Sequence, residues 1–341
     1  EAARRMGYRP NRAAQIMKFG KSQTIALIEF GIQSEVSHAI HYHVAKAVSR
    51  AGYDYLPVFG FLKEDVDSLV ARIVDARVDG AIISKMAAHF GIEQVRILQR
   101  AGIPVVGLLS REFPDVPLVL HDAEGGFATL TRHLLALGRR RLLLMIPDYP
   151  MKVWTTEGRM RGFRKAIQGA GGSVRLNASA EHVLPDRTTT GVTGEILKVP
   201  VGLPPYSSSD LSPAYWAARA ILKRPRLPDA ILGSNDQWAR SAISALMESG
   251  LRVPEDLVVT GYDNDSWSAY YPFRLTTVQP DTERECGMAV ELLFKKIAGE
   301  KRLPRRVVMP CTLVVRTSCG SVPTSHAQKN FIYRVDKIGA V

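Results

Sequence analysis

Three polar side chains stand at positions where a protein of this pattern could bind a small molecule. Asp263 follows an apolar stretch at residues 257–261, and Asn235 follows another at residues 230–232. A carboxylate accepts hydrogen bonds from two hydroxyls, whereas an amide both donates and accepts them. Arg159, near the start of a predicted helix, offers a planar fork of donors that suits vicinal hydroxyls or a carboxylate. Because strand carboxyl ends face the crevice of an open α/β sheet, these residues predict a site for a polar ligand.

Each of these residues also has a structural interpretation that the sequence leaves open. Asp263 could cap a short helix at residues 264–270. Asp236, next to Asn235, could cap the helix that follows it. Arg159 could be an ordinary surface arginine, since other arginines are close to it in the sequence.

Three further candidates complete the predicted ligand-binding set. Asp122 follows the strand predicted at residues 118–121, and it could either face the site or cap the next helix. Trp154 and Phe30 could stack on the ring of a ligand. An apolar core role is the commoner fate of such aromatic side chains.

A basic segment opens the chain. Its cationic residues stand against one acidic residue, Glu1, before Ser22, and they are Arg4, Arg5, Arg9, Arg12, Lys18 and Lys21. The formal net charge of the whole chain is +12, which favours polyanionic partners. Cationic side chains at this density can neutralise phosphates and release counterions. Asn11 after Pro10 is a natural helix start, so the segment predicts a nucleic-acid contact, with a solvated basic arm as the alternative.

Other chemistries lack their residue patterns. His38 and His41 would share a helical face, but no cysteine or carboxylate completes a ligand set, so we predict no metal site. The glycine-rich loops of nucleotide cofactors and the nucleophile elbow of hydrolases are missing from the sequence. No paired acid and base are visible either, and we therefore predict neither a cofactor nor an enzyme.

Cysteine usage and hydropathy bear on the compartment. Cys286, Cys311 and Cys319 are odd in number and have no metal-type spacing, which fits a reducing cytosol. No apolar run approaches the roughly 18 residues that a membrane helix needs. The start of the sequence shows no signal-peptide pattern. We therefore predict a cytoplasmic protein without a membrane partner.

The elements that must position these residues alternate along the chain. Its 341 residues suit two domains of ordinary size. Apolar runs indicate parallel strands covered on both faces, and stretches with apolar residues at helical spacing indicate helices. In the first part, strands are predicted at residues 23–30, 53–59, 80–84, 104–109 and 118–121, and helices at 37–51, 64–76 and 92–100.

A second alternating set follows. Strands are predicted at residues 141–146, 230–232, 257–261, 275–278 and 306–315, and helices at 123–137, 157–169, 212–222, 236–249 and 281–298. The pattern breaks down among prolines at residues 177–211, which predicts a long irregular insertion. Residues 321–341 lack periodicity and are predicted to be an irregular tail. Two sets of similar size indicate an α/β fold of two similar lobes.

Four motifs resemble those of the lactose-repressor/galactose-repressor (LacI/GalR) family of bacterial transcription regulators. They are Gly7-Tyr8-Arg9-Pro10-Asn11 with Ala13-Ala14 and Met17; Gly158-Arg159-Met160-Arg161-Gly162-Phe163; Pro228-Asp229-Ala230-Ile231 leading to Asn235-Asp236-Gln237; and Gly261-Tyr262-Asp263-Asn264 followed by Leu275-Thr276-Thr277-Val278. The resemblance extends over about residues 2–319. Each motif alone is a weak signal, but their order and spacing together are specific.

The resemblance implies a periplasmic-binding-protein-like body of two Rossmann-like lobes with parallel sheets, preceded by a truncated DNA-binding and hinge segment. Residues 1–21 would be the remnant of the DNA-binding domain plus the hinge helix. The N-terminal lobe would comprise residues 22–121 and 279–309, and the C-terminal lobe residues 122–278 and 310–320. An effector is then expected in the cleft between the lobes, and the protein is expected to be a homodimer.

In that family the hinge helix lies in the minor groove of DNA, and an apolar side chain wedges between base pairs. Met17 matches the wedge position, and Ala14 matches the small residue that lets the helix sit close. The predicted DNA-binding set of the hinge is Tyr8, Arg9, Asn11, Arg12, Ala14 and Met17. A helix-turn-helix expected upstream of Glu1 would supply sequence-specific contacts to operator DNA, and we expect weak DNA binding without it.

The sequence therefore predicts a DNA-binding transcriptional regulator, a repressor, controlled by a small polar effector such as a sugar. The segment at residues 31–37 lacks the Asn-Pro-Phe-Phe usual in the family, so the effector of a relative cannot be transferred to this chain. The alternative is a periplasmic-type sugar-binding protein of a transport system. Such a protein would share the fold, but it would need a signal peptide and would gain nothing from a basic hinge.

Overall fold

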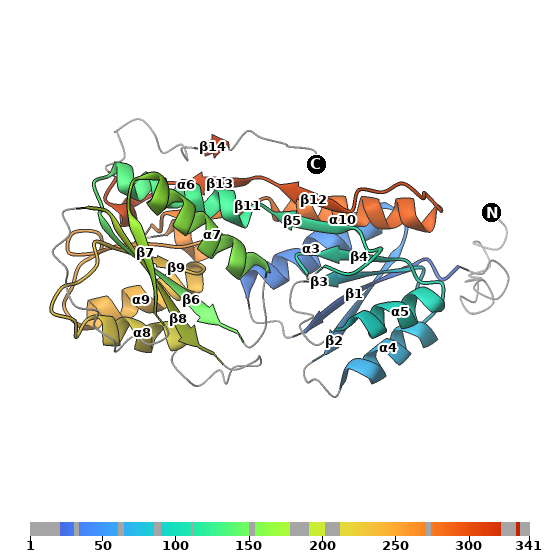
Figure 1. Cartoon of the computed structure of the whole chain (residues 1–341). Helices are drawn as coiled ribbons and strands as arrows, with labels where there is room; N and C mark the ends of the chain where they lie inside the picture. The colour runs from blue at the N-terminus through green and yellow to red at the C-terminus, as the bar shows by residue number, and fades with distance from the viewer. Residues whose placement is uncertain are drawn as a thin grey trace. The chain divides into compact units, whose positions relative to one another are not determined.

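The computed structural model of the chain describes most of its residues (Figure 1). These are residues 21–30, 34–60, 65–84, 90–110, 112–149, 154–177, 191–201, 212–270, 274–321 and 332–334, without the side chains of Phe30, Asp65, Trp154 and 332–334. The chain forms two compact units. The N-terminal unit takes the chain up to Leu120 together with Thr282–Val307, and the C-terminal unit takes His121–Asp281 together with the chain from Val308.

The N-terminal unit is built on a six-stranded sheet in the order β12-β5-β4-β3-β1-β2. Its strands are β1 (Thr24–Phe30), β2 (Asp54–Gly60), β3 (Gly80–Ser84), β4 (Val105–Leu108), β5 (Leu118–His121) and β12 (Arg306–Met309). The pairs from β2 through β1, β3 and β4 to β5 are parallel. Every residue of β3, β4 and β5 is buried, which is why these strands are continuous apolar runs in the sequence.

Helices cover both faces of this sheet. They are α3 (Glu35–Arg50), α4 (Asp65–Asp75), α5 (Ile92–Arg100) and α10 (Thr282–Ile297). Ile25 and Leu27 of β1 pack into a cluster with α3 and α10. Ala26 and Ile28 pack into another with α4 and α5. Successive side chains of a strand point to opposite faces, so one apolar strand serves both clusters.

The C-terminal unit repeats this plan on a five-stranded sheet in the order β10-β9-β6-β8-β7. Its strands are β6 (Arg141–Asp148), β7 (Ser173–Asn177), β8 (Thr193–Pro200), β9 (Ala230–Gly233) and β10 (Val258–Thr260), all paired in parallel. Its helices are α6 (Ala123–Ala136), α7 (Trp154–Gly169), α8 (Pro213–Ile221) and α9 (Asp236–Glu248). Leu142 and Leu144 of β6 pack with α6 and α7, whereas Leu143 and Met145 pack with α8 and α9.

The predicted irregular insertion is wrong where β8 forms. This strand lies between β6 and β7 in the sheet, so it is central rather than an insertion. Gly194 weakens its apolar pattern, but a Cβ there would lie 2.9 Å from the ring of Phe163. Glu195 is held by two hydrogen bonds from Arg224, at 2.9 and 2.8 Å. Gly194 and Glu195 interrupt the apolar pattern of this strand in the sequence. Their contacts with Phe163 and Arg224 explain why they are there.

Two predictions near the carboxyl end also need correction. The single strand predicted at residues 306–315 is two strands, β12 and β13 (Cys311–Val314), separated by Pro310, which has no N–H to donate to a sheet. β13 pairs antiparallel with β11 (Thr277–Pro280) and with β14 (Ile332–Arg334). The irregular tail predicted at residues 321–341 therefore contains a strand that joins a small sheet.

Two glycines let α7 lie against α6. A Cβ at Gly162 would be 2.1 Å from the carbonyl oxygen of Glu124, and a Cβ at Gly158 would be 3.0 Å from the Cβ of Ala123. Backbones can approach this closely only where no side chain intervenes. Since Arg159 lies between these two glycines, the helix contact fixes the direction in which its side chain leaves α7.

Candidate functional site

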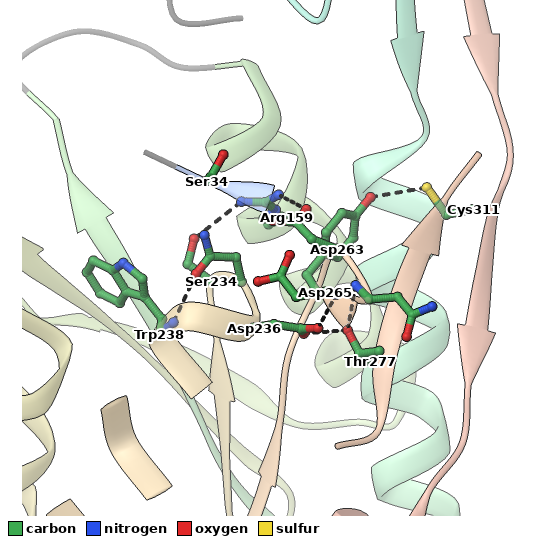
Figure 2. A network of polar contacts seen from close by, with 12 residues as sticks. Ser34, Arg159, Ser234, Asp236, Trp238, Asp263, Asp265, Thr277 and Cys311 are labelled. Carbon is green, nitrogen blue, oxygen red and sulfur yellow. Dashed lines mark hydrogen bonds and ion pairs between the residues drawn. The ribbon is translucent and has the colours of Figure 1, made fainter. Parts of the chain in front are cut away.

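Polar side chains gather at the carboxyl ends of β9 and β10 (Figure 2). Ser234 follows β9 directly, and Asp263 follows β10 after Gly261 and Tyr262. A Cβ at Gly261 would lie 2.1 Å from the Oδ1 atom of Asp236, the first residue of α9. The ends of adjacent parallel strands are where open α/β sheets bind ligands, and here they bring these groups together within one unit.

Arg159 is the cation of this cluster, and it is only 8 % exposed. Its Nη1 donates to the Ser234 hydroxyl at 3.3 Å, and its Nη2 lies 3.5 Å from Oδ1 of Asp263. Figure 2 shows the guanidinium between these two partners. Within the described part of the chain, the buried Nε of Arg159 has no hydrogen-bond acceptor. One donor of a buried guanidinium is thus left for another group.

Tyr262 supports the guanidinium from one side. The Cζ atom of Arg159 lies 4.4 Å from the centre of the Tyr262 ring, a cation–π contact. The ring is fully buried and stacks on Phe127 with centroids 5.5 Å apart. Its hydroxyl meets Sγ of Cys311 at 3.1 Å, and burial raises the pKa of Tyr262. Arg159 therefore rests on a neutral ring that the core holds in place.

Asp236 is a fully buried carboxylate below this pair. It accepts hydrogen bonds from the hydroxyls of Ser268 and Thr277, each at 2.5 Å, and from the backbone N–H of Asp265 at 2.9 Å. Burial, reinforced by the nearby carboxylates of Asp263 and Asp265, raises the pKa of Asp236 to about 8, while the two hydroxyls lower it. The group therefore changes its charge near neutral pH.

The backbone that carries Asp263 is strained. Asp263 has a φ of 106° and Asn264 a φ of 55°, a region that costs energy for residues with a side chain. Hydrogen bonds hold this turn: the Asp263 N–H donates to the Val278 carbonyl at 2.8 Å, and Arg316 donates to Oδ1 of Asn264 at 2.7 Å. Strain held by its surroundings is typical of functional turns.

Two predicted ligand contacts are helix caps in the structure. Oδ1 of Asn235 accepts the Trp238 N–H at 3.0 Å and so begins α9, whereas Asp236, the cap considered from the sequence, is the buried carboxylate. Oδ1 of Asp122 accepts the Gly125 N–H at 2.7 Å and begins α6. Their roles as ligand contacts stay predictions. Asp263, the third candidate cap, pairs with Arg159 instead.

The remaining predicted residues lie beyond what the structure describes. The side chains of Phe30 and Trp154 are not described, although their backbones belong to β1 and α7. The hinge set, which is Tyr8, Arg9, Asn11, Arg12, Ala14 and Met17, lies outside the described residues. The DNA-binding role of this set stays a prediction.

Sequence reasoning missed Ser234, Tyr262 and Thr277 as members of the cluster. Ser234 and Tyr262 each sit between a strand and a residue that we did select, Asn235 and Asp263 respectively. Their place directly after an apolar strand was an available signal. Thr277 had no such signal, because it follows Thr276 in a strand and its contact with Asp236 spans 41 positions of sequence.

The N-terminal unit has its own buried polar network. Glu29, at 0 % exposure near the end of β1, accepts a hydrogen bond from Ser37 at 2.7 Å and lies 2.9 Å from Nε2 of His41. The Nδ1 of His41 contacts the hydroxyl of Tyr55, whose pKa is raised by burial and by Glu29. One histidine of the predicted helical pair thus has a carboxylate partner from β1.

Two observations bear on metals and membranes. Among the described residues, no group of three or more His, Cys, Asp and Glu side chains is placed to hold a metal ion. None of the helices in the same part of the chain is long and apolar enough to cross a membrane. Cys286, Cys311 and Cys319 are all buried.

Family models match both parts of the chain. The model described as "Periplasmic binding protein-like domain" matches residues 131–319, which is more than half of the chain. The model described as "Periplasmic binding proteins and sugar binding domain of LacI family" matches residues 33–184. The α/β fold with parallel sheets predicted from the sequence is thereby confirmed.

Relatives that match over most of this chain are named as transcriptional regulators. The HTH-type transcriptional repressor PurR of Pasteurella multocida is 28% identical over 331 residues, which are 94% of this chain and 88% of that protein. Among solved structures, the complex of the transcriptional regulator CelR with cellobiose has a TM-score of 0.69 and 25% identity, covering 93% of this chain and 88% of CelR. The lac repressor dimer bound to operator and the anti-inducer ONPF has a TM-score of 0.70 at 21% identity, covering 91% and 99%, and shows the shared fold. With the family model that spans its greater part, the chain belongs to the periplasmic-binding-protein-like domain family, among the LacI-family transcriptional regulators.

Proposed function

We propose that this chain is a DNA-binding transcriptional repressor that senses a small polar effector, a sugar or related metabolite, through Arg159 and Asp263. The observation that carries the proposal is the buried Arg159 guanidinium, whose Nε has no acceptor among the described residues. Leaving a buried charged donor without an acceptor costs free energy. A ligand that supplies the acceptor would recover that cost.

The chemistry around Arg159 favours a ligand with several hydroxyls. Arg159 donates, the Asp263 carboxylate only accepts, and the Ser234 hydroxyl can do both. A hydroxyl group is both donor and acceptor, so vicinal hydroxyls can satisfy Arg159 and Asp263 together. An apolar ligand would leave the pair's remaining hydrogen-bonding capacity unused. The expectation that the effector lies between the two lobes remains a prediction.

The regulator interpretation is preferred to the transport interpretation. The relatives that match over most of this chain are named as transcriptional regulators. Residues 1–21 are rich in arginine and lysine, which a solute-binding protein has no use for. We accordingly propose operator DNA and a second copy of the chain as partners, and the cytoplasm as the site of action.

The effector site is tested by a thermal-shift screen of sugars and nucleobases against the parent and Arg159→Met. The matched control is Arg161→Met, because Arg161 lies on the same helix but pairs with Glu124 at 3.0 Å and is partly exposed. A ligand that stabilises the parent and Arg161→Met should stabilise Arg159→Met much less. Losing one charge-assisted hydrogen bond should weaken affinity by about tenfold or more.

A second pair of variants tests the carboxylate. Asp263→Asn should also weaken the shift, whereas Asp256→Asn should not, because Asp256 forms an exposed pair with Arg252 four positions away. A ligand that stabilises Arg159→Met and Asp263→Asn as well as the parent would exclude these residues as its contacts.

The hinge is tested on the full-length protein with operator DNA. Met17→Gly should reduce both affinity and DNA bending, since glycine cannot wedge between base pairs. Arg132→Met, a change at an exposed arginine of α6, is the control for a substitution away from the hinge and should bind as the parent does. Unchanged affinity and bending in Met17→Gly would contradict the wedge.

A further inference from the structure

The turn that carries Asp263 is bonded directly to β11. The Asp263 N–H donates to the carbonyl of Val278 at 2.8 Å. The next N–H, of Asn264, points to Oγ1 of Thr277 at 3.4 Å. The backbone before the turn is also attached, because the Gly261 N–H donates to the Thr276 carbonyl at 3.0 Å. A displacement of Asp263 would therefore act directly on β11 through these hydrogen bonds.

The Asp236 carboxylate joins the far side of the same turn to the same strand. Its Oδ2 accepts the Asp265 N–H and the Ser268 hydroxyl, and its Oδ1 accepts the Thr277 hydroxyl. The Thr277 hydroxyl thus serves both Asp236, as a donor, and the Asn264 N–H, as an acceptor. Figure 2 shows Asp236, Asp265 and Thr277 in contact beneath Asp263. Asp236, Thr277 and Ser268 are at most 1 % exposed, so water does not replace these bonds.

β11 is also where the chain leaves the C-terminal unit. The strand ends at Pro280, the unit ends at Asp281, and α10 of the N-terminal unit begins at Thr282. Thr277 therefore begins the strand that leads into the connection between the units.

We propose that Asp236 and Thr277 are positioning residues that couple the Arg159–Asp263 pair to β11, and through it to the connection between the units. They do not touch the ligand. Asp236 holds the turn through the Asp265 N–H and holds the strand through the Thr277 hydroxyl. Ligand binding at Asp263 and the conformation of β11 therefore change together. The inference rests on the proposed function for the identity of the site, but the mechanical link is a property of the C-terminal unit alone.

Thr277→Val and Thr277→Ser separate this link from packing. Valine keeps the shape of threonine but has no hydroxyl, so Asp236 loses one of its three donors and the Asn264 N–H loses its acceptor. Serine keeps the hydroxyl and loses only a methyl group. Asp229→Asn is a control for general destabilisation, because Asp229 precedes the opposite end of β9, where its carboxylate pairs with Arg141.

The first arm needs no ligand and measures hydrogen–deuterium exchange by mass spectrometry. Thr277→Val should raise exchange across residues 262–268 by about tenfold or more, because the Asn264 N–H loses its acceptor and Asp236, the acceptor of the Asp265 N–H, loses the hydroxyl that holds it. Thr277→Ser and Asp229→Asn should leave this segment near the parent rate. Circular dichroism establishes that each variant is folded.

The coupling between Asp263 and β11 is then measured by adding Asp263→Asn to the parent and to each Thr277 variant. In the parent and in Thr277→Ser, this change should raise exchange in residues 276–281. In Thr277→Val it should have little further effect, because the part of the link that runs through the Thr277 hydroxyl is already broken. Equal effects of Asp263→Asn in all backgrounds, or no change of residues 262–268 in Thr277→Val, would overturn the proposal.

The second arm adds cellobiose or D-ribose as probe. A probe that binds the parent should protect residues 276–281 in the parent and in Thr277→Ser. In Thr277→Val that protection should disappear, and affinity should fall about tenfold by calorimetry. Protection that survives in Thr277→Val would overturn the coupling. If no sugar or nucleobase binds the parent, the proposed function fails, while the ligand-free arm still decides whether Asp236 and Thr277 couple the turn to β11.

Discussion

At the scale of single residues, the properties of the site depend on charges that the fold has removed from water. Arg159 is neutralised in part by Asp263 and supported by Tyr262. Asp236 has no cationic hydrogen-bond partner among the bonds described for it and relies on hydroxyls and a backbone N–H. A buried carboxylate held only by neutral donors keeps its proton to higher pH than an exposed one.

The titration of Asp236 should make the free energy of unfolding depend on pH. Its pKa is raised to about 8 in the folded state, whereas an unfolded aspartate loses its proton near pH ~4. At a pH between these two pKa values, the folded state binds more protons than the unfolded state. The contribution of Asp236 is therefore fully present below about pH 4 and is lost as the pH rises through about 8, at no more than about 1.4 kcal/mol per pH unit.

Asp236→Asn removes this titration without removing the side chain. Urea unfolding of parent and variant should show the stability of the parent falling relative to Asp236→Asn as the pH rises from about 5 to 8. Other groups are common to both proteins and cancel in the difference. Parallel curves over this range would mean that Asp236 does not bind a proton in the folded state.

At the scale of elements, the contact between α6 and α7 positions Arg159. This contact depends on Gly158 and Gly162, where the backbone of one helix lies against the other. The Asp122 cap fixes the start of α6, and the core side chains Phe127 and Phe163 fill the space between these helices and the sheet. A change in helix spacing would therefore move Arg159 relative to Ser234.

Gly162→Ala should disturb this contact. The new methyl group would lie 2.1 Å from the Glu124 carbonyl oxygen, which backbone cannot easily avoid, so the free energy of unfolding should fall by about 1–3 kcal/mol. Gly169→Ala is the matched control at the other end of α7, where a Cβ meets nothing within 4 Å. It should be neutral or stabilising, by up to about 1 kcal/mol from helix propensity. Equal stability of the two variants in urea unfolding would contradict the close contact.

At the scale of the whole molecule, the two units have separate hydrophobic cores built on the same plan. Each has a parallel sheet between two helical layers. The C-terminal unit leaves large apolar side chains exposed, including Trp216, Met247 and Tyr270. Exposed apolar side chains of this size are frequent in protein interfaces.

A homodimer should make stability depend on protein concentration. The melting temperature should rise with concentration, because association stabilises the folded state by mass action. Sedimentation equilibrium over the same concentrations should show the mass moving from one copy to two. A monomer mass with a constant melting temperature would contradict the proposed homodimer.

The sequence by itself determined most of the elements, the fold class and the family. Apolar runs such as β3 and β4 are buried on both faces, and helix starts are capped by residues next to them, as Ser212 caps α8. These signals are local, so they are present in the chain before it folds. The same holds for the placement of Asp263 after a strand and of Arg159 near the start of a helix, although their role as effector contacts stays a prediction.

Tertiary structure alone decided which neighbouring residue takes which role. Asn235 caps α9 while Asp236 turns into the core, and nothing local distinguishes an asparagine cap from an aspartate cap. The contact of Arg159 with Ser234 spans 75 positions, and the contact of Asp236 with Thr277 spans 41. The need for glycine at position 194 of β8 likewise comes from Phe163, a residue of another element. Such contacts form only after the sheet brings distant strand ends together, so the link from Asp263 to β11 is a property of the fold.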